Sequence, residues 1–153
     1  MKTLFSCAVL GASLCVLAPA GAADKATAAE AVAMTQKAIA YIKENGKDKA
    51  FAEFANPANT TFHDRDLYIY VYDMKGVAVA HGVNPKMVGR DLLELRDGDG
   101  QYIVKRFIET ASGPAGKGWV EYKWPNPLTK TVDLKAGYVE RSGDLIVGSG
   151  IYK

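Results

Sequence analysis

The side chains best suited to chemistry in this chain are tyrosines, tryptophans and cations that recur on strand-like runs. A buried carboxylate needs a charged donor such as lysine or arginine, and neutral hydroxyls can add hydrogen bonds. Tyrosine and tryptophan rings also provide apolar walls that carry one polar end. This combination favours recognition of a small anion over catalysis. The candidate ligand-binding residues are Tyr70, Tyr72, His81, Arg96, Trp124, Lys135 and Tyr138.

Lys135 is our first choice for the cation that compensates a bound anion, because a strand holds a side chain more rigidly than a loop does. Lys135 and Tyr138 fall on opposite faces of a regular strand, so only one of them can reach a pocket unless Gly137 marks a bulge. Arg96 lies in a loop expected to cover the pocket. Its guanidinium could hold a carboxylate through two hydrogen bonds, although most loop arginines are solvated.

The remaining candidates each have a structural alternative. Tyr70 and Tyr72 alternate with aliphatic residues, and this pattern also suits simple packing of a half-buried face. Trp124 precedes a proline and could equally belong to the core. His81 ends a strand, where it either donates to a carboxylate or is satisfied by its neighbours.

Catalytic and metal chemistry have little support. Cys7 and Cys15 both lie in the N-terminal apolar segment, so the rest of the chain has no thiol for catalysis, disulfides or metal binding. His63 and His81 are the only histidines, whereas a metal site needs three or four ligands. Ser149 stands between two glycines inside a strand, where glycines allow close backbone approach. We expect no catalytic residue, no metal and no cofactor.

The N-terminus has the features of an export signal. Lys2 precedes a short uncharged run, and small residues follow it around Ala22 and Ala23, where we expect cleavage. Residues 1–22 are therefore predicted to be a signal peptide and residues 23–153 a single domain outside the cytoplasm, periplasmic or secreted. The 19 basic and 17 acidic residues nearly balance, which argues against a nucleic-acid partner.

Hydrophobic periodicity predicts an α+β domain. Helices are expected over residues 25–45 and 47–54, and strands over 67–72 and 77–81. A third helix should open at Asp99 or Gly100 and end at 112–116, with Asp97–Gly100 forming a turn and helix cap. Three strands then follow within residues 118–152. Short turns between consecutive strands favour antiparallel pairing. The aliphatic face of the strand at 67–72 should meet the N-terminal helix, and its tyrosine face the third helix.

Six segments together resemble the Cache family of extracellular sensor domains, specifically the single Cache domain of type 2. The matching segments are Asp66–Asp73, Ala80-His81, Asn84–Leu92, Tyr122–Pro125, Tyr138-Val139 and Ile146–Tyr152. The resemblance implies a PAS-like antiparallel sheet of about five strands, with a long N-terminal helix on one face and a ligand pocket on the other. It also implies a short organic acid as ligand, such as a carboxylate of two to four carbons, and favours His81 as a pocket residue.

Two interpretations of function remain open from sequence. In the first, the domain binds a small organic acid and acts in signal transduction through a separate membrane histidine kinase or chemoreceptor. In the second, it is an interaction subunit that docks on a membrane kinase, chemoreceptor or redox protein without a free ligand of its own. The N-terminal helix can also form a homodimer along its exposed stripe, although its alanines offer little area to bury.

Overall fold

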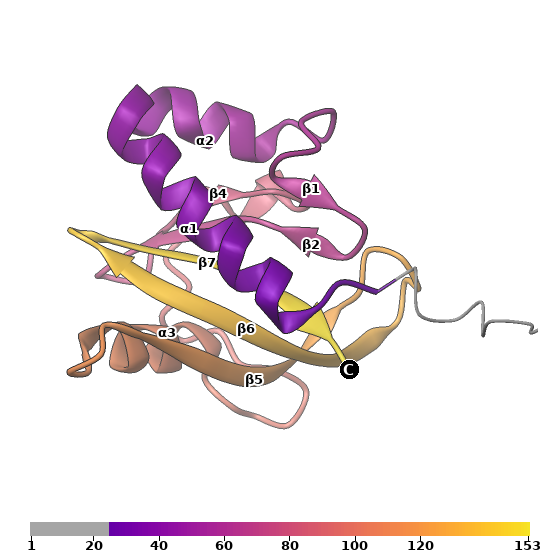
Figure 1. Ribbon diagram of the computed structural model, residues 1–153. Coiled ribbons are helices and arrows are strands. Elements are labelled where there is room, and N and C mark those ends of the chain that lie inside the picture. The colour runs from indigo at the N-terminus through magenta and orange to yellow at the C-terminus, as the bar shows by residue number, and fades with distance from the viewer. Residues whose placement is uncertain (1–24) are drawn as a thin grey trace, which may run out of the picture.

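The computed structural model describes residues 25–153, which form a five-stranded antiparallel sheet between helices (Figure 1). The elements are α1 (Ala28–Asn45), α2 (Lys47–Ala55), β1 (His63–Asp64), β2 (Leu67–Tyr68), β3 (Tyr70–Asp73), β4 (Ala78–His81), a 3-10 turn η1 (Pro85–Met87), α3 (Ile103–Ser112), β5 (Lys117–Pro125), β6 (Val132–Ser142) and β7 (Leu145–Tyr152). The predicted α+β architecture is confirmed. The predicted signal peptide at residues 1–22 lies outside the described residues and stays a prediction.

The strands of the large sheet are arranged in the order β4-β3-β7-β6-β5. β7 is central, because it pairs with β3 on one side and with β6 on the other. The long β5–β6 hairpin forms one half of the sheet, with Tyr122 opposite Lys135 in its register. Lys135 in turn lies opposite Tyr152 of β7. The register therefore brings these three side chains together on one face.

The two faces of the sheet belong to separate cores, as the alternation in residues 67–72 predicts. Leu67, Ile69 and Val71 pack with α1 and α2, whereas the tyrosines between them pack with α3 and the segment before it. Figure 1 shows α1 crossing one face and α3 lying behind the other. The expected single strand is divided at Ile69, because β2 pairs with β1 and β3 pairs with β4 and β7.

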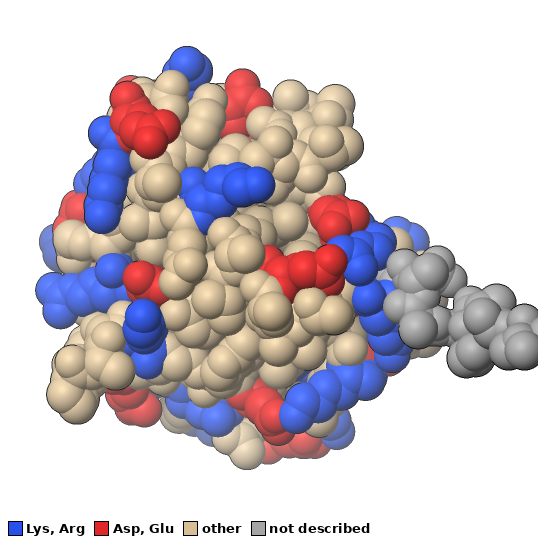
Figure 2. All heavy atoms as spheres, viewed as in Figure 1, with Lys and Arg blue, Asp and Glu red and all other residues tan. Residues whose placement is uncertain are grey.

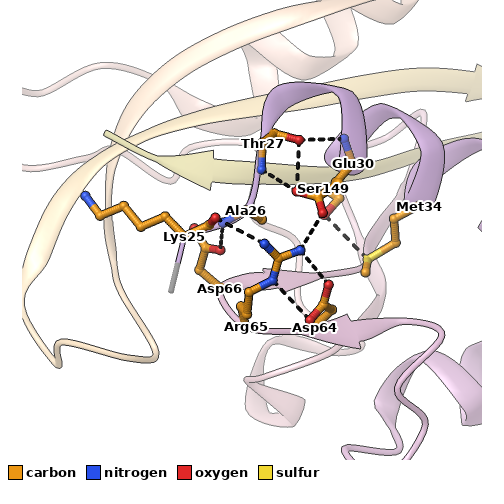
Figure 3. A network of polar contacts seen from close by, with 9 residues as sticks. All are labelled: Lys25, Ala26, Thr27, Glu30, Met34, Asp64, Arg65, Asp66 and Ser149. Atoms are coloured by element: carbon orange, nitrogen blue, oxygen red, sulfur yellow. Dashed lines mark hydrogen bonds and ion pairs between the residues drawn. The ribbon is translucent and has the colours of Figure 1, made fainter. Parts of the chain in front are cut away.

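α1 begins three residues later than predicted because Thr27 caps it. The Thr27 hydroxyl accepts from the backbone N–H of Glu30, and the Glu30 carboxylate accepts from the backbone N–H of Thr27. Arg65 ties this first turn to the β1–β2 hairpin through an ion pair with Glu30 at 2.7 Å (Figure 3). The buried Asp66 carboxylate accepts from the backbone N–H of Ala26 at 2.8 Å. The helix is thus anchored at its N-terminal end.

α3 also begins later than predicted, at Ile103 instead of Asp99 or Gly100. The reason is Asp97, whose Oδ1 accepts from the backbone N–H groups of Asp99 and Gln101, each at 2.9 Å. Its second oxygen accepts from the backbone N–H of Lys123 at 3.1 Å. The Asp97–Gly100 segment is therefore a turn, as expected, but it fastens a loop to β5 and does not cap the helix.

The described surface carries charges of both signs. On the face seen in Figure 2, lysines and arginines are interspersed with aspartates and glutamates around a band of uncharged residues. Within residues 25–153, no helix has the length and apolar character that crossing a bilayer requires.

Candidate functional site

The candidate site is a buried cavity between the tyrosine face of the sheet and α3. Its volume is about 10 Å³, close to the minimum that holds one water molecule. Its lining residues are Tyr68, Tyr70, Tyr72, His81, Ile103, Phe107, Tyr122 and Trp124. The aromatic rings are in close contact: Tyr70 stacks on Phe107 with 5.5 Å between centroids and a 12° interplanar angle. The cavity thus has aromatic walls with several hydroxyl groups.

Larger hollows lie on the surface but lack this enclosure. One of about 430 Å³ is lined by residues 99–102 together with Lys105, Arg106 and Glu109. Another of about 450 Å³ lies beside Lys25, Arg65 and Leu128. Their charged side chains face solvent and carry both signs. Binding sites for small molecules are typically enclosed and mostly apolar with a few polar groups, so the small buried cavity is the better candidate.

Two glycines on the central strands allow the Tyr70 ring to lie against the sheet. A Cβ at Gly148 would stand 2.4 Å from Tyr70 Cε2, and one at Gly137 would stand 2.6 Å from Tyr70 Oη. No side chain fits at such distances. The Tyr70 hydroxyl then donates to the backbone carbonyl of Ser149 at 3.2 Å. Both glycines therefore position a cavity wall, a role consistent with the close backbone approach that strand glycines allow.

Lys135 is fully buried behind the cavity. Its Nζ lies 3.8 Å from the centroid of the Tyr68 ring and 4.7 Å from that of Tyr152. It donates one long hydrogen bond, of 3.5 Å, to the Tyr152 hydroxyl. In the part of the chain that the structure describes, Lys135 takes part in no ion pair. The predicted strand cation is thus present beside the cavity and lacks a carboxylate partner.

The energetics of Lys135 favour its neutral form. Burying an ammonium costs several kcal/mol in real proteins, whereas a desolvated contact with an aromatic ring returns about 2 kcal/mol. A single 3.5 Å hydrogen bond adds little, because it is longer than the usual range. Burial accordingly lowers the pKa of Lys135 well below its usual value, and the negative charge of Asp66 opposes this only in part.

His81 is buried at the same site, with its ring 5.2 Å from that of Tyr68 and 6.4 Å from that of Trp124. Its Nδ1 accepts from the backbone N–H groups of Val83 and Asn84, at 3.3 and 3.1 Å. Nδ1 therefore carries no proton, and Nε2 is the N–H donor. Burial, assisted by Lys135, lowers the pKa of His81 to about 3.

We expect the pKa of His81 to make the domain sensitive to acid. Below pH 6.5 the unfolded chain protonates this imidazole, but the folded protein resists until about pH 3. Stability is therefore lost as the pH falls through this window, by about 3 kcal/mol at pH 4.5. In His81→Asn, the amide oxygen can replace Nδ1 as acceptor without titrating. Urea unfolding at pH 7.5 and pH 4.5 should show a smaller loss in the variant, and equal losses would contradict the assignment.

The structure does not bring Tyr138 and Arg96 to the cavity. Tyr138 lies opposite Ser149, whose hydroxyl faces Met34 of α1. Tyr138 is therefore on the α1 face, where its hydroxyl donates to Glu140 at 2.9 Å. No bulge interrupts β6 at residue 137, so the sheet separates Tyr138 from Lys135. Arg96 is exposed, and its guanidinium lies 3.9 Å from the centroid of the Tyr102 ring.

The other candidates of the sequence analysis are brought together. Tyr70, Tyr72, His81 and Trp124 line the cavity, and Lys135 lies directly behind it. Three further residues were not singled out as site residues: Tyr68, Tyr122 and Tyr152. Tyr68 lies on the same strand face as Tyr70, and Tyr122 lies two residues before Trp124. The two-residue periodicity of a strand alone could therefore have identified both as site residues. Tyr152 joins the site only through its register with Lys135.

No cluster of three or more His, Cys, Asp or Glu side chains among residues 25–153 is arranged to hold a metal ion. His63 instead contacts two backbone carbonyls, with Nε2 3.0 Å from Gly82 O and Nδ1 3.4 Å from Asn59 O. The Ser149 hydroxyl lies in the core against Met34 Sδ at 3.8 Å.

Comparison with known proteins shows the same kind of domain. The model of the family described as Single Cache domain 2 matches residues 21–153. The methyl-accepting chemotaxis protein McpP of Pseudomonas putida is 30% identical over 92 residues, which are 59% of this chain and 17% of the relative. The sensor histidine kinase MctS of Rhizobium johnstonii is 30% identical over 115 residues, which are 73% of this chain and 24% of the relative. The chain thus spans about a fifth of the length of these relatives.

A solved structure shares the fold. It is described as showing the structural basis for carboxylic acid recognition by a Cache chemosensory domain. It aligns with a TM-score of 0.63 and 23% identity, covering 78% of this chain and 84% of that one.

Proposed function

The chain belongs to the single Cache domain 2 family, and from this membership we propose that it is an extracytoplasmic sensor domain whose buried cavity binds a short carboxylate of two to four carbons. The signal-like N-terminus supports the location outside the cytoplasm. The homology to a chemoreceptor and a sensor kinase supports a role in sensing instead of catalysis. The cavity residues proposed to hold the ligand are Tyr68, Tyr70, Tyr72, His81, Tyr122, Trp124 and Lys135.

The observation that carries this proposal is the unpaired lysine at an aromatic cavity. Lys135 is fully buried and has no carboxylate partner among the described residues. A ligand carboxylate would supply the missing counter-charge, and a pair formed away from water is stronger than one at the surface. The nearby hydroxyls and the Nε2–H of His81 would add neutral donors. The fold neighbour described as recognising carboxylic acids is in keeping with this chemistry.

The size of the cavity favours a small ligand. Its 10 Å³ is less than even acetate requires, so the walls must move outward when a ligand enters. Trp124 is only half-buried and lies at the edge of the aromatic cluster, 6.0 Å from the Tyr122 ring. Rotation of this ring is the simplest way to enlarge the cavity without disturbing the sheet. Each additional carbon of the ligand would demand a larger displacement.

We further propose that the occupied domain signals through a membrane protein of the chemoreceptor or histidine-kinase class. These are the classes to which the two relatives belong. The homodimer predicted from the N-terminal helix remains part of this proposal.

A thermal-shift screen with acetate, propionate, lactate, pyruvate and butyrate tests the ligand class. A ligand present at 100 times its Kd stabilises the folded state by about 2.7 kcal/mol, which raises the midpoint by several degrees in a domain of this size. Acetamide is the matched control for acetate, since it has a similar shape but no charge. We expect at least one acid to raise the midpoint and acetamide to leave it unchanged. No shift with any acid would contradict the proposed function.

A further inference from the structure

The protonation state of Lys135 must change if a carboxylate is to be held there. In the unliganded protein its Nζ has aromatic rings on several sides, with the centroid of Tyr70 5.6 Å away and that of Tyr68 at 3.8 Å. An ammonium carries three N–H donors, yet among residues 25–153 only Tyr152 Oη accepts from Lys135, at 3.5 Å. The Tyr152 hydroxyl in turn donates to the backbone carbonyl of Pro125 at 2.7 Å. These surroundings suit an amine and leave two of the three N–H donors of an ammonium without an acceptor among the described residues.

Within the part of the chain that the structure describes, no other group at the cavity is free to accept a proton. His81 Nδ1 receives two backbone N–H groups, so its protonation would break both hydrogen bonds. The tyrosines carry their protons already, and burial raises the pKa of Tyr68 and Tyr70. Asp66, the nearby carboxylate, is engaged by the backbone N–H groups of Ala26 and Tyr152. The Lys135 amine is the one acceptor left among the described residues that surround the cavity.

We propose that binding of a carboxylate takes up one proton from solvent onto the Lys135 amine, so that the ammonium–carboxylate pair exists only in the bound state. This inference rests on the proposed function. The balance is R–COO⁻ + H⁺ + Lys–NH₂ giving Lys–NH₃⁺ beside R–COO⁻, and no bond of the ligand is broken. The proton and the anion enter a net neutral pair, so the cavity gains no net charge on binding.

Proton uptake makes the apparent affinity depend on pH. Where the free protein holds the amine and the complex holds the ammonium, the dissociation constant should rise by nearly tenfold for each pH unit. Acetate itself stays ionised throughout neutral and alkaline pH, so the dependence cannot arise from free ligand. The occupancy of the domain would therefore depend on both the carboxylate concentration and the pH.

Calorimetric titration with acetate and propionate at pH 8 in phosphate and in Tris tests the inference on the unaltered protein. These buffers differ in ionisation enthalpy. If about one proton is taken up per ligand bound, the binding enthalpies observed in the two buffers should differ by about the difference between those ionisation enthalpies. Carboxyl-labelled acetate observed by ¹³C NMR should show that the bound ligand stays ionised, which places the proton on the protein. Equal heats in the two buffers, or a protonated bound ligand, would overturn the inference.

Lys135→Arg provides the matched variant, because a guanidinium keeps its charge at all accessible pH values. We expect this variant, where it binds acetate, to do so without dependence on the buffer. If the parent protein binds acetate with equal heats in phosphate and in Tris, proton uptake alone would be overturned and the proposed function would stand. The absence of binding by every acid of the thermal-shift screen would overturn both.

Discussion

Replacing Lys135 with methionine should weaken carboxylate binding by about 2–5 kcal/mol, the usual cost of removing one partner of a buried charge pair. This corresponds to a loss of about 30-fold to more than 1,000-fold in affinity. Methionine keeps the length of the stem up to Cε, with sulfur in place of Cδ, and removes the nitrogen, so the aromatic walls retain most of their contacts. Calorimetric titration with the tightest-binding acid of the screen measures the effect. Arg96→Met is the control and should leave affinity unchanged, because Arg96 is exposed beside Tyr102.

The same substitution should stabilise the unliganded fold. The folded protein holds Lys135 as an unprotonated amine, and removing its proton at neutral pH costs free energy that a methionine in its place does not cost. The unfolded chain keeps the Lys135 proton up to about pH 10.4, whereas burial lowers the pKa in the folded state. The stability of the parent protein therefore rises with pH across this window, and the advantage of the variant should shrink. Urea midpoints at pH 7 and pH 9 measure this, and a less stable Lys135→Met variant would contradict it.

Gly148→Ala should destabilise the protein by about 1–3 kcal/mol or more, as expected for overpacking of a well-packed core. The new Cβ would meet Tyr70 Cε2 at 2.4 Å and the backbone carbonyl oxygen of Tyr138 at 2.7 Å. The second contact is with β6 itself, so rotation of the Tyr70 ring alone cannot relieve the crowding. The displaced ring would also enter the cavity, and the shift in midpoint produced by carboxylates should shrink or vanish.

Gly98→Ala is the matched control for this substitution. A Cβ at Gly98 would meet only the end of the Lys123 stem, at 4.0 Å. At such a position an alanine commonly stabilises by about 0.4–1 kcal/mol, because it restricts the unfolded chain. Urea unfolding and acetate-induced shifts of both variants give the comparison. Equal stability of Gly148→Ala and the parent would show that the glycine does not position Tyr70.

The features of the site that follow from the alternation of side chains along one strand could be predicted from the sequence. Alternation over residues 67–72 was enough to assign the aliphatic residues to the α1 face and the tyrosines to the α3 face, and both assignments are confirmed. The same period separates Lys135 from Tyr138. It cannot say which of the two faces the cavity, because that depends on the pairing of β6 with β5 and β7, between residues distant in sequence.

The parts fixed by side-chain capping were harder to predict. The sequence predicts that a helix opens at Asp99 or Gly100, because acidic residues and glycines commonly precede helices. In the structure the two carboxylate oxygens of Asp97 instead accept from three backbone N–H groups of the loop and of β5, and α3 begins only at Ile103. The same loop leaves Arg96 on the surface instead of above the cavity. Such tertiary hydrogen bonds have no signature in the local sequence.

The central place of β7 also sets the order in which this domain can fold. β3 can pair with β4 early, but its other edge finds a partner only when residues 145–148 arrive, because Tyr70 pairs with Gly148 and Asp73 with Leu145. At synthesis rates of about 5–20 residues per second, that strand follows β3 from the ribosome by roughly 4–15 seconds. Until then the aliphatic and tyrosine faces of β3 have no complete sheet to support them. Pairings this distant in sequence also slow folding, so the sheet can be completed only after β7 has been synthesised.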